Sequence, residues 1–165
     1  MNGPILIAIG SNLADATGQA PLDSCRAAVA AMGGLAGLRV RAVSRWYSSA
    51  PVPASDQPDY INGVALLEGR IAPAVLLAAL QGLETAAGRR RGAANAARIL
   101  DLDIIAMGDL VRPAPDPVLP HPRAHERAFV LAPLADVAPD WCHPVLHQSV
   151  GVLLKALGEQ RICAL

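Results

Sequence analysis

The chain has 165 residues, of which 53% are hydrophobic and 17% charged, and its formal net charge is zero. This composition excludes a disordered chain, which needs few apolar residues and a large net charge. Neutrality also argues against a general nucleic-acid binder, which would carry a basic excess. We therefore expect one globular domain over residues 1–165, long enough to bury a core without a metal or disulfides.

The sequence shows no sign of membrane insertion or export. No apolar run reaches the roughly 18 residues that a membrane span needs, and no basic region precedes the first apolar segment, as a signal peptide would require. The three cysteines, Cys25, Cys142 and Cys163, are too widely spaced to suggest a disulfide framework. We expect a cytoplasmic monomer with no membrane or nucleic-acid partner.

In chain order, the first 107 residues alternate between predicted strands and helices. Apolar runs or apolar–polar alternation predict strands over 5–9, 38–47, 60–67 and 99–107. Ala-rich segments that stop at glycine predict helices over 21–32 and 73–87. The resulting order β-α-β-β-α-β is the ferredoxin-like α+β arrangement, an antiparallel sheet with helices on one face.

The other segments are predicted to be loops and two C-terminal helices. Residues 48–59 hold three prolines, and residues 112–122 hold five, so neither segment suits regular structure. Residues 88–98 are rich in Arg, Ala and Gly and are predicted to form a mobile loop. Two further helices are predicted over 123–137 and 146–157.

Asp101 and Asp103 carry the strongest chemical signal. Side chains alternate along a strand, so these two carboxylates share one face, about 6.6–7 Å apart. Charges beside apolar neighbours need compensation, and one or two carboxylates plus substrate phosphates are the usual ligands of Mg²⁺. A solvated sheet face is the alternative interpretation.

A basic segment comes immediately before these aspartates. Arg89, Arg90, Arg91 and Arg98 lie within residues 88–98, which contain no acidic residue. Phosphoryl transfer needs a metal on the bridging oxygens and Arg on the charge that develops around phosphorus. An Arg-rich segment alone would indicate a solvated loop, but beside the two aspartates it favours a nucleoside triphosphate site.

Weaker patterns leave alternatives open. Residues 10–12 (Gly-Ser-Asn) fit a ligand cradle or a plain turn. Asn62, in mid-strand, fits recognition of a heterocycle edge or an exposed polar position. The four histidines form two pairs with a spacing of four, which fits zinc ligands or isolated surface side chains, and His121 alone could contact a phosphate.

Four segments carry a family likeness: IAIGSNL at 7–13, QPDYIN at 57–62, RILDLD at 98–103, and LPHP at 119–122 with RAF at 127–129. In this order they resemble the 6-hydroxymethyl-7,8-dihydropterin pyrophosphokinases of folate biosynthesis. The resemblance implies a ferredoxin-like fold and transfer of pyrophosphate from ATP to the pterin hydroxymethyl group, with release of AMP.

The same resemblance implies a set of site residues. Asp101 and Asp103 would hold two Mg²⁺ ions, and Arg89 and Arg98 would act on the transferred phosphates as catalytic residues. The nucleotide contacts would be Gln81, Glu84, Arg91, Arg98, Ile104, His121 and Arg127. The pterin contacts would be Ser49, Ala50, Val52, Tyr60, Asn62 and Phe129.

Two other hypotheses fit the same residues. A palm-like nucleotidyl transferase would use a paired-aspartate motif but release pyrophosphate instead of AMP. A non-enzymatic ligand-sensing module on the same fold would not need Asp101 and Asp103 together. Magnesium-dependent ATP binding separates the sensor from both enzymes, and the nucleotide product separates the enzymes from each other.

Overall fold

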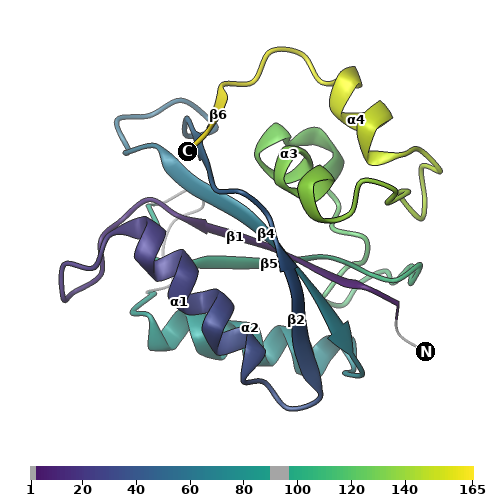
Figure 1. Cartoon of the computed structure of the whole chain (residues 1–165), viewed down its shortest axis with the longest axis horizontal. Helices are drawn as coiled ribbons and strands as arrows, with labels where there is room; N and C mark the ends of the chain where they lie inside the picture. The colour runs from purple at the N-terminus through teal and green to yellow at the C-terminus, as the bar shows by residue number, and fades with distance from the viewer. Residues whose placement is uncertain (1–2, 90–96) are drawn as a thin grey trace.

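The computed structural model describes residues 3–89 and 97–165, and these form a six-stranded antiparallel sheet between two layers of helices (Figure 1). The strands are β1 (Ile5–Ser11), β2 (Leu38–Val43), β3 (Tyr47–Ser49), β4 (Tyr60–Gly69), β5 (Asp101–Met107) and β6 (Ile162–Ala164). Their order is β5-β1-β4-β3-β6, and β2 pairs with β4 beside β3. The expected antiparallel α+β architecture is confirmed.

The helices divide between the two faces of the sheet. They are α1 (Pro21–Gly33), α2 (Pro73–Ala86), α3 (Ala128–Val137) and α4 (Val150–Ala156), with a short 3₁₀ turn, η1 (Ala124–Glu126). Both α1 and α2 begin at proline, whose fixed φ suits the first helical position. They cover one face, while α3 and α4 cover the other (Figure 1), so the expectation of helices on one face was incomplete.

Strand β1 contributes to both cores because its side chains alternate between the faces. Ile5, Ile7 and Ile9 join the core beneath α1 and α2, whereas Leu6 joins the core beneath α3 and α4. A strand buried on both faces needs an unbroken apolar run, and residues 5–9 supply one.

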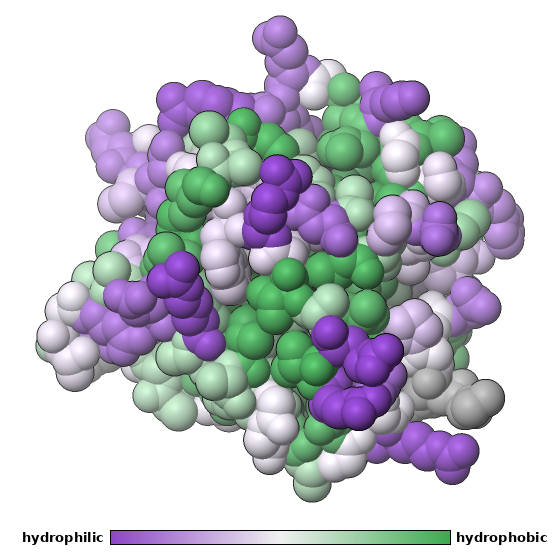
Figure 2. All heavy atoms as spheres, in the orientation of Figure 1, coloured by the Kyte–Doolittle hydropathy of each residue, from purple (hydrophilic) through white to green (hydrophobic). Residues whose placement is uncertain are grey.

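The surface carries both apolar and hydrophilic side chains. Figure 2 shows apolar residues toward the middle of one face and hydrophilic residues around its outline.

The single strand predicted over 38–47 is instead two strands. The backbone hydrogen bonding between β2 and β4 is interrupted at Ser44. Here the Val64 N–H donates to Ser44 Oγ at 2.9 Å instead of to a backbone carbonyl. Trp46 then lies over β4 at Gly63, where a Cβ atom would come within 2.5 Å of the indole ring. The chain therefore leaves β2 at Ser44 and rejoins the sheet as β3.

Two C-terminal predictions also differ from the structure. The helix predicted over 123–137 is interrupted at Arg127, whose extended backbone separates η1 from α3. The helix predicted over 146–157 begins only at Val150, where Ser149 caps it by accepting a hydrogen bond from Val152 N at 3.2 Å. Strand β6 was not predicted. Within the described ranges, no helix is both long enough and apolar enough to cross a membrane.

Candidate active site

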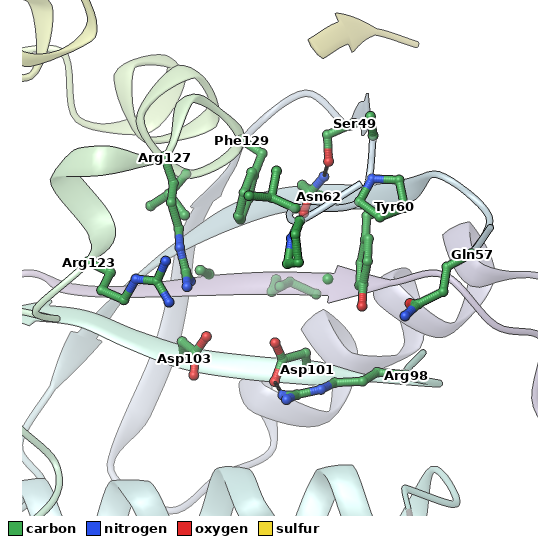
Figure 3. A pocket seen from close by; sticks show the side chains of 18 of the residues that line it. Ser49, Gln57, Tyr60, Asn62, Arg98, Asp101, Asp103, Arg123, Arg127 and Phe129 are labelled. Carbon is green, nitrogen blue, oxygen red and sulfur yellow. Dashed lines mark hydrogen bonds and ion pairs between the residues drawn. The ribbon is translucent and has the colours of Figure 1, made fainter. Parts of the chain in front are cut away.

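A cavity of about 470 Å³ opens between the sheet and the start of α3 (Figure 3). Its floor is formed by β1 and β5, one wall by β4 with the loop that follows β3, and the opposite wall by residues 121–130. The cavity thus joins segments that lie far apart in the sequence, from Ala8 to Val130.

Asp101 and Asp103 lie on the cavity floor, as the alternation in β5 predicts. Between them Leu102 is buried in the opposite core, which turns both carboxylates toward the cavity. In the neighbouring strand, Gly10 pairs with Asp101 and Ala8 pairs with Asp103. These two small residues leave open space beside the carboxylates, so the local sequence of both strands creates the site.

The environment of Asp103 disfavours an uncompensated charge. Burial raises the pKa of Asp103 to about 6, and the nearby Asp101 and Glu84 carboxylates act in the same direction, against the guanidinium groups of Arg127 and Arg98. Within the described residues, Asp103 forms no salt bridge. A cation beside the two aspartates would remove this repulsion.

The donor set of the aspartate pair fits a hard divalent cation. Two carboxylates supply oxygen ligands, which Mg²⁺ prefers, and leave most of its coordination positions to water or substrate. In the described part of the chain, no group of three or more His, Cys, Asp or Glu side chains is placed to hold a metal ion. The histidine pairs therefore do not form such a group there.

Two arginines, Arg89 and Arg98, bind Asp101. Arg98 Nη1 lies 2.8 Å and Arg89 Nη1 lies 3.1 Å from Asp101 Oδ1. Arg89 also lies 2.6 Å from Glu84 Oε2, and the other oxygen of Glu84 accepts from the Leu102 N–H at 2.8 Å. Burial raises the pKa of Glu84 despite these donors. Glu84 thus anchors Arg89 and β5 to α2.

The predicted pterin contacts come together at the other side of the cavity. Asn62 on β4 donates from Nδ2 to Ser49 Oγ on β3 at 2.6 Å, and both side chains are buried. Phe129 and Tyr60 lie on either side of Asn62 (Figure 3). Burial raises the pKa of the Tyr60 hydroxyl. This wall combines aromatic faces with a fixed amide, which suits a flat heterocycle.

The structure brings most, but not all, of the predicted site residues to the cavity wall. Those that line it are Ser49, Ala50, Val52, Tyr60, Asn62, Arg98, Asp101, Asp103, His121, Arg127 and Phe129. Those that lie outside the wall are Gln81, Glu84, Arg89 and Ile104, and the Ile104 side chain is buried in the core beneath α1 and α2. Arg91 lies outside the described residues.

Arg123 was not predicted from the sequence, and the role of Asn12 was left open. Arg123 lines the cavity beside His121, and its N–H donates to His121 Nδ1 at 3.1 Å. Its place two residues after the LPH segment was the available signal. Asn12 is a structural joint: its side chain bonds to residues 57, 58 and 98 rather than forming a ligand cradle.

The acidic pair and the guanidinium groups of Arg98, Arg123 and Arg127 that share one cavity suit an enzyme that transfers phosphoryl groups. A family model described as 7,8-dihydro-6-hydroxymethylpterin-pyrophosphokinase (HPPK) matches residues 6–139. The chain belongs to this family. It is accordingly an ATP-dependent transferase of folate biosynthesis, which moves a pyrophosphoryl group to hydroxymethyldihydropterin.

Individual relatives agree with this assignment. The chain is 43% identical over 136 residues to the 2-amino-4-hydroxy-6-hydroxymethyldihydropteridine pyrophosphokinase of Pseudomonas aeruginosa, covering 82% of this chain and 81% of that protein. It is 35% identical over 159 residues to the protein of the same name from Haemophilus influenzae, covering 96% of each.

A solved structure supports the fold. The crystal structure of wild-type Plasmodium falciparum HPPK-DHPS with STZ-DHP matches 94% of this chain with a TM-score of 0.71 at 11% sequence identity. The present chain covers only 43% of that longer chain.

Proposed function

We propose that the cavity binds ATP and 6-hydroxymethyl-7,8-dihydropterin together and that AMP is the leaving group. The observation that carries this proposal is the division of one cavity into two chemical halves. Asp101, Asp103 and Arg98 provide charges for phosphates, while Asn62 and the aromatic side chains provide a wall for the pterin ring. The pterin hydroxyl oxygen would attack the β-phosphorus and release its proton to solvent, and the bond from that phosphorus to the α-phosphate oxygen would break.

We propose that Asp101 and Asp103 are the protein ligands of two Mg²⁺ ions. When bound, Mg²⁺ would neutralise phosphate charge and lower the pKa of the attacking hydroxyl. The raised pKa of Asp103 supports this role, because a cation favours the ionised carboxylate that burial and Asp101 oppose.

Arg89, Arg98 and Arg127 are proposed to bind the phosphates and stabilise the charge on the transferred group. Both Arg89 and Arg98 are held on Asp101, so their guanidinium groups are positioned before the substrate arrives. Arg127 extends from the start of α3 toward Asp103 (Figure 3). The assignments of Gln81, Glu84, Arg91 and Ile104 to the nucleotide rest on the family likeness.

His121 is proposed to donate a hydrogen bond to a phosphate oxygen. Burial, followed by the charge of Arg127, lowers the pKa of His121, so the imidazole is neutral at neutral pH. Its Nδ1 accepts a hydrogen bond from Arg123 N at 3.1 Å, which places the proton of the neutral ring on Nε2. That N–H is the available donor.

The pterin is proposed to lie between Tyr60 and Phe129, against Asn62 and Ser49. Because Asn62 Nδ2 already donates to Ser49 Oγ, the amide oxygen of Asn62 is the group suited to accept from a pterin N–H. Ala50 and Val52, in the loop after β3, would cover the ring from the solvent side.

We also propose that residues 1–165 form one domain of the ferredoxin-like class and that the enzyme is a cytoplasmic monomer. The order β5-β1-β4-β2, antiparallel throughout, supports this class, because it brings the last strand of a βαββαβ unit beside the first. The free Cys25, Cys142 and Cys163 thiols suit a reducing compartment. Light scattering on the purified enzyme tests the monomer.

The first experiment is measurement of AMP release from Mg-ATP with and without 6-hydroxymethyl-7,8-dihydropterin. AMP that appears only with the pterin is the expected result. Pyrophosphate as the product would favour a nucleotidyl transferase. Magnesium-dependent ATP binding without AMP release under any condition would overturn the proposed reaction and favour a sensor.

A further inference from the structure

The last six residues, 160–165, form a strap that connects three parts of the cavity wall. The strap returns from α4 to the sheet, where it ends as β6 (yellow in Figure 1). The family model matches residues 6–139 only, so the strap lies beyond the matched region. Its contacts nevertheless fall on elements that carry the proposed substrate contacts.

Gln160 binds the backbone on both sides of Arg127. Its Oε1 accepts from the Ala128 N–H at 2.9 Å, and its Nε2 donates to the Glu126 carbonyl at 2.9 Å. One side-chain amide therefore holds the two residues that flank Arg127 in the chain. The contact spans 32 residues of sequence in one case and 34 in the other.

This contact meets a need that Arg127 itself cannot satisfy. Arg127 is the N-cap residue of α3, a position that favours Ser, Thr, Asp or Asn because their side chains accept from the first free N–H groups. The Arg127 side chain makes no such bond. It points into the cavity toward Asp103 (Figure 3), and its guanidinium carbon lies 5.5 Å from the centre of the Phe129 ring. Gln160 supplies the missing acceptor from outside the helix.

The strap is itself fixed to the other two parts of the wall. Arg161 Nη2 lies 3.0 and 3.1 Å from the two carboxylate oxygens of Asp59, which directly precedes Tyr60. Strand β6 pairs with β3, with Ile162 opposite Ser49. Gln160 therefore acts from a segment anchored on both the Tyr60 and the Ser49 side of the cavity.

We propose that Gln160 is a positioning residue for Arg127: it fixes the extended backbone at the start of α3 and thereby directs the guanidinium toward the phosphates of ATP. The proposal rests on the nucleotide role of Arg127 given under Proposed function. Loss of the amide frees the backbone around Arg127 while every group that contacts substrate remains present. The Michaelis constant for ATP should therefore rise more than kcat falls.

The test compares two variants of the full chain with a matched control. Gln160→Leu removes both hydrogen bonds, whereas Gln160→Glu keeps an acceptor for Ala128 N–H and loses the donor to the Glu126 carbonyl. Glu159→Gln alters the exposed neighbouring residue and serves as the control. AMP release gives KM and kcat, and urea unfolding gives stability. We expect KM for ATP to rise about tenfold in Gln160→Leu, less in Gln160→Glu, and not in Glu159→Gln.

A double-mutant cycle with Arg127→Ala separates positioning from general destabilisation. If Gln160 acts through Arg127, the double variant Arg127→Ala/Gln160→Leu has the same KM for ATP as Arg127→Ala alone. Multiplied effects would assign Gln160 a merely structural role and overturn the proposal. Should Gln160→Leu not fold, the same cycle is run with Gln160→Glu.

The outcomes also distinguish this proposal from the one on which it rests. If Arg127→Ala raises KM for ATP but neither Gln160 variant does, the strap proposal fails and the nucleotide role of Arg127 stands. If Arg127→Ala leaves KM for ATP unchanged, both assignments fail.

Discussion

Tyr47 donates its phenolic hydrogen to Asp136 Oδ2 at 2.8 Å, a bond that joins β3 to α3. Asp136 also accepts from the Arg45 N–H at 3.2 Å and from Arg45 Nη2 at 3.1 Å. Strand β3 carries Ser49, and α3 carries Phe129, so the bond links two walls of the cavity from a position outside it. Removal of the hydroxyl should therefore loosen this link without altering a substrate contact.

Tyr47→Phe should lower the free energy of unfolding by about 1–3 kcal/mol, because the hydroxyl donates to Asp136 and also accepts from Arg45 Nη2 at 2.9 Å. The ring packing is retained, and Asp136 keeps its bonds to Arg45. Urea unfolding of Tyr47→Phe, Asp136→Ala and the double variant measures the coupling. Losses that simply add would show that the two side chains do not interact in solution.

Asn12 joins three segments at the edge of the cavity. Its side chain is 2% exposed; Oδ1 accepts from the Arg98 N–H at 2.8 Å, and Nδ2 donates to Gln57 Oε1 and the Pro58 carbonyl, each at 3.1 Å. The Arg98 carbonyl in turn accepts a hydrogen bond from Asn12 N at 3.0 Å. The position of Arg98 over Asp101 therefore depends on a side chain at the end of β1.

Asn12→Asp should be strongly destabilising despite its similar shape. The carboxylate can still accept from Arg98 N, but it would place a buried charge against two oxygens that now receive hydrogen bonds. We expect a loss of about 2–4 kcal/mol in the free energy of unfolding and about a tenfold fall in kcat/KM. Ala16→Asp adds the same charge at an exposed site in the same loop, and equal losses in the two variants would contradict the argument.

Asp103→Asn should affect activity and stability in opposite directions. Without the carboxylate, kcat should fall by at least about 10²–10³, as when a main electrostatic stabiliser is removed. In the metal-free protein at pH 7, the folded state carries an Asp103 charge that burial and Asp101 oppose. The neutral amide removes this repulsion, so the free energy of unfolding should rise. Kinetics and urea unfolding on the same sample measure both effects.

Asp109→Asn is the control for this pair of effects. Asp109 lies just beyond the end of β5 and is exposed, so its removal makes the same change in net charge away from the cavity. Neither kcat nor the unfolding midpoint should change. Unchanged turnover by Asp103→Asn would refute the metal-ligand assignment.

The parts of the fold that follow from local rules were predictable from the sequence. The two-residue period of a strand placed Asp101 and Asp103 on one face, and Ala-rich segments that stop at glycine located α1 and α2 to within one residue at each end. The break at Ser44 was not predictable in this way. The break depends on the Ser44 hydroxyl, which replaces a backbone carbonyl as the acceptor for the Val64 N–H. Val64 is 20 residues further along the chain, so no local sequence pattern indicates this hydrogen bond.

The same distinction between local and long-range interactions applies to the candidate site. Its charged residues lie close together in sequence, and the family likeness named most of the residues that line the cavity. The contacts that hold those residues were missed because they are long-range. Arg98 depends on Asn12, which is 86 residues away, and the backbone around Arg127 depends on Gln160. An acceptor such as Gln160 has no distinguishing sequence signal until the fold brings it to α3.

His143 should make the fold sensitive to acid. The side chain is 4% exposed, and its Nδ1 accepts from Val145 N at 3.2 Å and Leu146 N at 3.1 Å in the loop before α4. Burial, and then the nearby His125 and His147, lower the pKa of His143 below its usual 6.5. The unfolded chain therefore binds this proton more tightly than the folded protein. The neutral His143 side chain therefore makes its full contribution to the free energy of unfolding above pH 6.5. This contribution is lost as the pH falls below 6.5.

His143→Asn tests this linkage, because an amide oxygen can take the place of Nδ1 as acceptor and does not titrate. Urea unfolding between about pH 7 and pH 5 should show a smaller loss of stability in the variant than in the wild-type protein. His147→Asn is the matched control: this histidine is exposed, and its φ of 55° is one that asparagine adopts readily. Because His147 is only the last of the three causes that lower the pKa of His143, the control should keep most of the wild-type pH dependence. An equal slope in His143→Asn and the wild type would show that His143 is protonated equally in the folded and unfolded states.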